Sequence, residues 1–270
     1  RWAMGFWNAV FFRSQRFEPD ASRSPEWNSG AYLAGALGHC AECHTPRNLG
    51  YGLNHRDELA GQELQGWRAY NITSDPEHGV GKWSDEALVQ YLSTGYAAGH
   101  ASANGPMGEA VAHSLQFLKP EDTAALVAWL RTVPPREGKD PIVVDPAPKA
   151  MVASSAVAPG GDDPTAEVDG QRLFEGACAS CHQWNGAGQQ TPNAGLAGTR
   201  GVNDPRGANV TQAILQGVKM RIGQTDIYMP AFGHAYSDPE VAALANYVIR
   251  HFGGKEGTVT AKDVADRRQL

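Results

Sequence analysis

Apolar residues along this chain recur mostly at helical spacing, in short runs bounded by residues that begin or end helices. Tyr32, Leu33 and Leu37 can share one helix face, and Gly38 follows directly as a helix end. A helix of this kind is therefore expected over residues 27–37. Similar patterns predict further helices over residues 84–94, 119–133, 170–177, 211–216 and 237–248. The fold is expected to be mainly α.

The same succession of features occurs twice, which indicates an internal repeat at the scale of a domain. Each half has a helix, a cysteine motif, loops, a methionine and a capped closing helix. The stretch between the halves is dominated by Pro, Ala, Ser, Gly and Asp and has no sustained period, as in a linker. Cleavage near Ala158 is expected to leave two folded fragments. The expected boundaries are an N-terminal segment at 1–26, domains at 27–134 and 170–254, the linker at 135–169 and a polar tail at 255–270.

All four cysteines lie in two copies of one motif, Cys-x-x-Cys-His. The copies span residues 40–44 and 178–182. Two thiols three positions apart can each form a thioether to a vinyl group of haem, and the next histidine then lies under the iron. We therefore expect two covalently bound haems c. Their attachment residues are Cys40, Cys43, Cys178 and Cys181, and their proximal iron ligands are His44 and His182.

Three other uses of paired cysteines fit the sequence less well. A thioredoxin-like pair would lie in a βαβ pattern, but no run of β-branched residues flanks either copy. A shared zinc site would not require a histidine after each pair. A disulfide framework is not expected in so long a chain with only four cysteines.

An iron that only passes electrons needs a sixth ligand, and one methionine per half occupies a suitable position. Met107 and Met229 each lie between the cysteine motif and the closing helix. A thioether is a soft ligand that stabilises Fe(II) and raises the reduction potential relative to a second histidine. His100 and His113 remain alternatives for the first iron. In the second half Met220 is instead expected to be packed or exposed, because charged residues flank it.

Composition and charge narrow the possible partners. The formal net charge of −6 argues against nucleic acid as a ligand. There is no apolar run near the roughly 20 residues that span a bilayer. Haem attachment to this motif takes place outside the bacterial cytoplasm, so an exported precursor is expected. The chain begins at Arg1 and shows no signal peptide, so it is expected to be a processed or partial product.

The first seventeen residues are unusually aromatic. Trp2 and Phe6 are four positions apart, as are Trp7 and Phe11, which suits one side of a helix. The segment is expected to dock a membrane or another protein domain. The alternative is that it packs on the core of this chain.

With these motifs placed, the chain resembles the cytochrome c subunits of membrane-bound bacterial dehydrogenases. The residues that carry the resemblance are Trp27–Leu33, Gly38–Asn48, Asn71–Thr73, Gly81–Ser84, Met229–Phe232 and Val241–Val248. The resemblance implies two class I cytochrome c-like domains in tandem. Such subunits typically carry three motifs, and this sequence has two. A third haem domain is therefore expected before residue 1, with the aromatic segment as the end of its linker.

The resemblance also implies a function. A catalytic dehydrogenase subunit, whether quinoprotein, flavoprotein or molybdoprotein, would oxidise an alcohol, sugar or aldehyde. Its electrons would pass through this chain to ubiquinone or another carrier, at the periplasmic side of the cytoplasmic membrane, with peripheral membrane association. This role needs no acid–base residues, so the chain itself is not expected to be an enzyme. The alternatives are a dihaem enzyme, such as a peroxidase or thiosulfate dehydrogenase, and a soluble dihaem shuttle.

Overall fold

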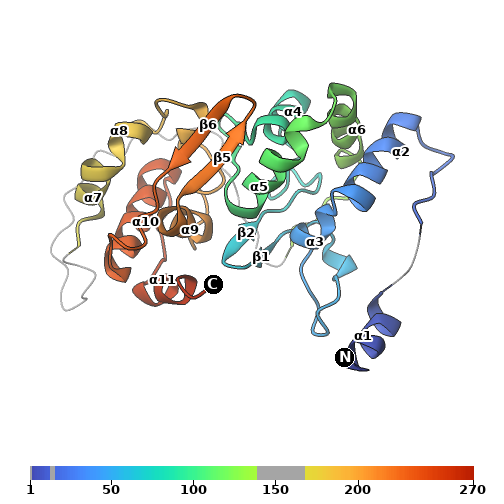
Figure 1. Ribbon diagram of the computed structural model, residues 1–270, viewed down its shortest axis with the longest axis horizontal. Coiled ribbons are helices and arrows are strands. Elements are labelled where there is room, and N and C mark those ends of the chain that lie inside the picture. Colours follow the sequence, from blue (N-terminus) through green and yellow to red (C-terminus); the bar gives the residue numbers. More distant parts are fainter. Residues whose placement is uncertain (1, 13–15, 139–167) are drawn as a thin grey trace. The chain divides into compact units, whose positions relative to one another are not determined.

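The computed structural model describes residues 2–12, 16–138 and 168–270, and most of the described elements are helices (Figure 1). The described chain forms two compact units, and the linker predicted at 135–169 lies largely outside the described residues. The first unit comprises Arg1–Leu64, Arg68–Asp85 and Leu118–Pro141, and the second comprises Gln65–Trp67, Glu86–Phe117 and Ile142–Leu270.

The first unit is built around α2 (Pro25–Tyr32) and α6 (Pro120–Leu130), which pack against each other. Ser24 caps α2, since its Oγ accepts a hydrogen bond from Trp27 N at 3.0 Å. A π-helical turn, η1 (Leu33–Leu37), continues α2 towards α3 (Cys40–His44). The short strands β1 (Gln62–Leu64) and β2 (Trp67–Ala69) pair with each other. A 3-10 turn, η2, covers His55–Asp57.

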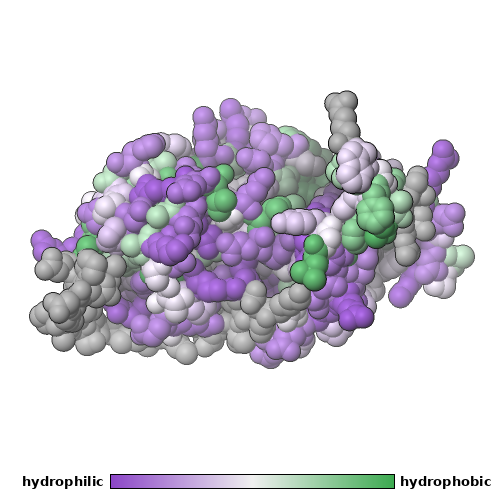
Figure 2. Space-filling view, turned by 90° about the horizontal axis from the view of Figure 1, so that it is seen from below, coloured by the Kyte–Doolittle hydropathy of each residue, from purple (hydrophilic) through white to green (hydrophobic). Residues whose placement is uncertain are grey.

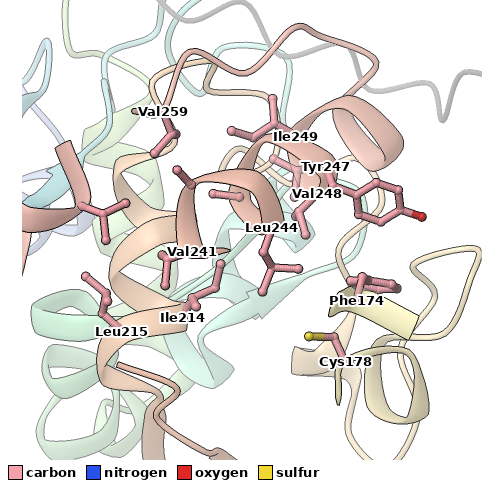
Figure 3. Packing of buried hydrophobic residues seen from close by; sticks show 14 of the residues in the cluster. Phe174, Cys178, Ile214, Leu215, Val241, Leu244, Tyr247, Val248, Ile249 and Val259 are labelled. Carbon is pink, nitrogen blue, oxygen red and sulfur yellow. The ribbon is translucent and has the colours of Figure 1, made fainter. Parts of the chain in front are cut away.

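The second unit holds the larger apolar core, centred on α10 (Asp238–Gly253). Side chains of α10 pack against α7 (Gly170–Ala177) and α9 (Ala208–Gln216), and Figure 3 shows Phe174, Cys178, Ile214 and Leu244 arranged around this core. A capping box of Ser237 and Glu240 begins α10. The other elements include η3 (Leu115–Phe117), α8 (Ala179–His182), η4 (Pro192–Ala194) and α11 (Ala261–Arg267).

A glycine allows the close packing of the helix pair in each unit. A Cβ on Gly30 of α2 would overlap the Ala125 carbonyl oxygen of α6. A Cβ on Gly170 of α7 would likewise overlap the Ala243 carbonyl oxygen of α10. The pairing of an entry helix with a closing helix is therefore built in the same way in both units.

Residues 86–117 pack with the second unit, although the sequence pattern assigns them to the first repeat. They form α4 (Asp85–Thr94), β3 (Tyr96–Ala97), β4 (Ala101–Ser102) and α5 (Gly105–His113). The Gln116 side chain donates to the Arg221 carbonyl at 2.8 Å and accepts from Gly223 N at 2.8 Å. Residues 86–117 pack with the second unit because α5 contacts the apolar face of a hairpin. This hairpin consists of β5 (Val218–Ile222) and β6 (Thr225–Met229).

This packing changes the expectation for cleavage near Ala158. Hydrogen bonds and apolar contacts within the second unit join residues on both sides of that position. We expect the two fragments of a chain cut there to stay associated under native conditions. Size-exclusion chromatography after limited proteolysis would measure this. Elution as two separate, folded haem fragments would instead support the independent domains that the sequence predicts.

The aromatic N-terminal segment forms a helix, α1 (Trp2–Phe11), that contacts a loop of its own unit. Trp7 Nε1 donates to the Gly50 carbonyl at 2.7 Å, and the Phe11 ring lies against Gly50 and Gly52. Trp2 and Phe6 are nevertheless 89% and 73% exposed. Figure 2 shows hydrophobic side chains standing out on a face that is otherwise largely hydrophilic. None of the helices in the described ranges is both long and apolar enough to cross a bilayer.

The C-terminal residues 255–270, expected as a polar tail, include α11, which is attached to the core. Val264 of α11 is fully buried in the core of the second unit. Arg268 donates to Asp238 Oδ1 at 2.5 Å and to the Tyr236 carbonyl at 2.7 Å, so it ties this helix to the start of α10. A buried valine and one arginine thus order a segment whose composition is mostly polar.

Candidate haem-attachment sites

In the second motif one helical turn carries both thiols and the histidine. Cys181 N donates to the Cys178 carbonyl at 3.1 Å, and His182 N donates to the same carbonyl at 3.0 Å. The turn follows α7, whose Phe174 carbonyl accepts from Cys178 N at 2.9 Å. The local sequence thus folds as a continuation of the entry helix, which sets the spacing of the three side chains.

The His182 ring is oriented by a backbone carbonyl. Its Nδ1 lies 2.7 Å from the Ala194 oxygen, on the loop that follows the motif. Burial lowers the pKa of His182, and the hydrogen bond to Ala194 acts in the opposite direction with a smaller effect. A neutral ring that donates from Nδ1 keeps its Nε2 lone pair for a metal.

The first motif repeats this arrangement in the first unit. His44 Nδ1 lies 2.6 Å from the Tyr70 carbonyl oxygen, and Gly61 N donates to the His44 carbonyl at 2.7 Å. The buried Thr45 hydroxyl accepts from Leu59 N at 3.0 Å and fixes the chain after the histidine. Arg47 pairs with Glu42 inside the motif at 2.5 Å. Both motif histidines therefore donate to a carbonyl that lies outside their motif.

One thiol of each motif has a raised pKa. Burial raises the pKa of Cys178 to about 11, and the neighbouring Cys181 adds to the shift. Burial also raises the pKa of Cys40. Thioredoxin-like cysteines have the opposite property, a lowered pKa that yields a thiolate. Within the described ranges no three His, Cys, Asp or Glu side chains are grouped so that they could hold a metal ion.

Met229 lies at the end of β6 and packs against the core that contains Cys178. The loop after it is held to the end of α9, because Phe232 N donates to the Ile214 carbonyl at 2.8 Å. Gly217 has φ of +71°, and a Cβ there would overlap the Met229 carbonyl oxygen. Met229 is thus the last residue of a strand and packs against the core of the second unit that contains Cys178.

The other candidate ligands are distributed as follows. Met220 is 6% exposed and packs with Ala112 and Ile227, so it is a packing residue. Met107 lies in the first turns of α5, in the second unit, whereas His44 belongs to the first unit. The Met107–His44 pair, with His100 and His113 as its rivals, therefore stays a prediction.

The sequence did not reveal the two carbonyl acceptors. Tyr70 lies 26 residues after His44, whereas Ala194 lies 12 residues after His182. A backbone carbonyl has no side-chain signature, and the unequal spacing prevents recognition by repeat. The only sequence signal is a loop with a Pro or aromatic residue in each half, which is not specific.

A comparison with known protein families identifies the fold that these sites occupy. The cytochrome c family model matches residues 29–134 and 167–250, which is more than half of the chain. The chain belongs to the cytochrome c family. This cytochrome c therefore carries covalently bound haem c, and the paired thiols with a carbonyl-held histidine fit that group. The predicted mainly α fold with two cytochrome c-like regions is confirmed.

Several curated proteins are similar to this cytochrome c over nearly its whole length. A fructose dehydrogenase cytochrome subunit of Gluconobacter japonicus is 38% identical over 99% of this chain and 57% of its own length. A gluconate 2-dehydrogenase cytochrome c subunit of Pantoea cypripedii is 32% identical over 100% of this chain and 62% of its own length. An alcohol dehydrogenase (quinone) cytochrome c subunit of Gluconacetobacter polyoxogenes is 30% identical over 99% of this chain and 58% of its own length. The chain thus spans somewhat over half the length of these relatives, and the predicted resemblance is confirmed.

Proposed function

We propose that this cytochrome c carries two covalent haems and passes electrons from a catalytic dehydrogenase subunit to ubiquinone or another carrier. The observation that carries the proposal is the repeated geometry of the two motifs. In each, one helical turn presents two cysteines and a histidine whose Nδ1 is held by a backbone carbonyl. Two equivalent sites suit a chain that relays electrons between haems.

The protein residues supply attachment, ligation and a dry environment. Cys40 and Cys43 would hold one porphyrin through thioethers, and Cys178 and Cys181 the other. His44 and His182 would bind the irons through Nε2. A haem c with histidine and methionine ligands supplies reversible one-electron chemistry.

The proposed sixth ligands are Met107 for the first iron and Met229 for the second. Met229 is supported by its contact with the core that contains Cys178. The buried side chains of that core would exclude water from the second porphyrin. A low local dielectric disfavours the extra positive charge of Fe(III), so this core would raise the reduction potential.

The proposed partner is a dehydrogenase subunit that oxidises an alcohol, sugar or aldehyde. The relatives above are named as cytochrome subunits of fructose, gluconate and alcohol dehydrogenases, which supports this class of partner. We place the protein on the periplasmic side of the cytoplasmic membrane, because haem is attached to such motifs outside the cytoplasm. Peripheral association with the membrane is supported by the exposed Trp2 and Phe6 of the uncharged helix α1.

Haem counting on purified protein tests this proposal. The intact mass and the pyridine haemochrome absorbance should both correspond to two haems per chain. The double variant Cys178→Ala/Cys181→Ala should lose the mass of one haem and half of the absorbance, because both thioethers of one site are removed. Ser180→Ala, a change inside the same motif, should lose neither. Full haem content in the double cysteine variant would contradict the proposed attachment site.

A further inference from the structure

The β3–β4 hairpin contacts the loop that orients the second motif histidine. Arg200 N donates to the His100 carbonyl at 2.8 Å, and the Ser102 hydroxyl donates to the Asn193 carbonyl at 3.3 Å. All of these residues belong to the second unit. Asn193 directly precedes Ala194, whose carbonyl accepts the ring proton of His182. The hairpin and the histidine are thus connected through one short backbone segment.

Two glycines of that loop lie directly against the hairpin. A Cβ on Gly195 would be 2.6 Å from the Tyr96 hydroxyl oxygen, and a Cβ on Gly198 would be 3.1 Å from Gly99 Cα. Gly195 has φ of −65°, a value that any residue adopts. Its lack of a side chain therefore leaves room for the Tyr96 hydroxyl and is not required by the backbone conformation.

A buried charge, Arg200, lies at the end of the loop. Arg200 is 4% exposed. Burial lowers the pKa of His100, and the Arg200 guanidinium lowers it further. The same guanidinium opposes the effect of burial that raises the pKa of Tyr91 to about 12. The Arg200 side chain thus lies near both the hairpin and α4.

We infer that residues 96–102 are a positioning element for the second haem, because they fix the Ala194 carbonyl that accepts the His182 ring proton. A stronger hydrogen bond from Nδ1 makes the imidazole a better donor to iron, which favours Fe(III) and lowers the reduction potential. The hairpin comes from the first sequence repeat, so one repeat adjusts the haem of the other. This inference rests on the proposed ligation of iron by His182.

The variant Gly195→Ala tests the contact with Tyr96 in the full-length protein with its haems. The added methyl group would lie 2.6 Å from the Tyr96 hydroxyl and 3.2 Å from the Pro192 carbonyl oxygen, so the loop should shift and the His182 hydrogen bond should weaken. We expect a higher reduction potential for one haem only, and exchange of the His182 ring proton faster by up to about tenfold, the value of one hydrogen bond. Adding Tyr96→Phe removes the opposing oxygen and should restore both values towards those of the wild type.

A second pair of variants tests the Ser102 contact without a steric wedge. Ser102→Ala removes the donor to Asn193 and should shift the same potential in the same direction. Ser102→Thr keeps a hydroxyl and serves as the matched control. This pair gives a result even where Gly195→Ala prevents haem attachment.

Spectroelectrochemistry and proton NMR of the reduced protein provide the readouts. Unchanged potential and exchange in both Gly195→Ala and Ser102→Ala, or no recovery on adding Tyr96→Phe, would overturn the positioning role. Failure of the underlying ligation would look different, since the wild type itself would then lack His182 ring signals shifted by the porphyrin. A change in the melting temperature alone would also overturn the inference. A contact that only stabilises the fold would leave the reduction potential of the second haem unchanged.

Discussion

Met229→Ala is expected to remove half of the weak sulfur-to-iron charge-transfer band that the oxidised protein shows in the near infrared. It should also lower the reduction potential of one haem by an amount on the order of 0.1 V. Different axial ligands set haem potentials over a range of roughly 0.8 V, so this shift is a fraction of that range. The reason is loss of the soft thioether, which stabilises Fe(II). Absorption spectra and a redox titration of the purified protein measure both effects. Met107→Ala should remove the other half of the band.

Met220→Ala is the matched control for this experiment. Met220 lies on the strand that pairs with β6, and its side chain is buried between Ala112 and Ile227. Its removal should cost about 2–5 kcal/mol of unfolding free energy, as is usual for a cavity in a core. It should leave the near-infrared band intact. Loss of the band in Met220→Ala with retention in Met229→Ala would exchange the roles of the two methionines. An unchanged spectrum in Met107→Ala would give its role to His100 or His113.

Gly170→Val is expected to destabilise the second unit by on the order of 3–5 kcal/mol. The new Cβ would overlap the Ala243 carbonyl oxygen and lie 3.0 Å from Tyr247 Cβ. A backbone carbonyl inside α10 cannot move aside, so α7 and α10 would have to separate. Thermal unfolding followed by circular dichroism and by Soret absorbance measures the loss. Gly30→Val should act in the same way on α2 and α6 of the first unit.

Gly176→Ala on the same helix provides the control for Gly170→Val. A Cβ on Gly176 would meet no atom within 4 Å. Alanine is a better helix former than glycine by up to about 1 kcal/mol, so this variant should be neutral or stabilising. If Gly170→Val unfolds at the same temperature as Gly176→Ala, the close approach of α7 and α10 is not a requirement of the fold.

Much of the secondary structure follows from local sequence. Ser24 and Ser237 begin α2 and α10 as caps, and Gly254 ends α10 with φ of +63°. The β5–β6 hairpin was missed, although alternation of Val218, Met220 and Ile222 with charged residues is a strand signal. The alternation covers only five residues, and a nearby helical pattern at 208–216 obscures it.

The sequence by itself determined the family of this protein and predicts its haem-attachment residues. Two copies of Cys-x-x-Cys-His place two thiols and one imidazole on a single helical turn, and this requires only local hydrogen bonds such as Cys181 N to the Cys178 carbonyl. The helices themselves follow from apolar periodicity, whereas the close approach at Gly30 and Gly170 is seen only in the structure. The motif turns and the helices depend on neighbours within a few residues.

Only the tertiary structure decided which carbonyls hold the histidines and which unit contains residues 86–117. The Tyr70 and Ala194 acceptors are backbone atoms, which every residue possesses, so no residue type marks them. The contact of Tyr96 with Gly195 joins positions that are 99 residues apart in the sequence. Such contacts depend on how the apolar faces of distant elements pack against one another, and no local pattern in the sequence indicates them.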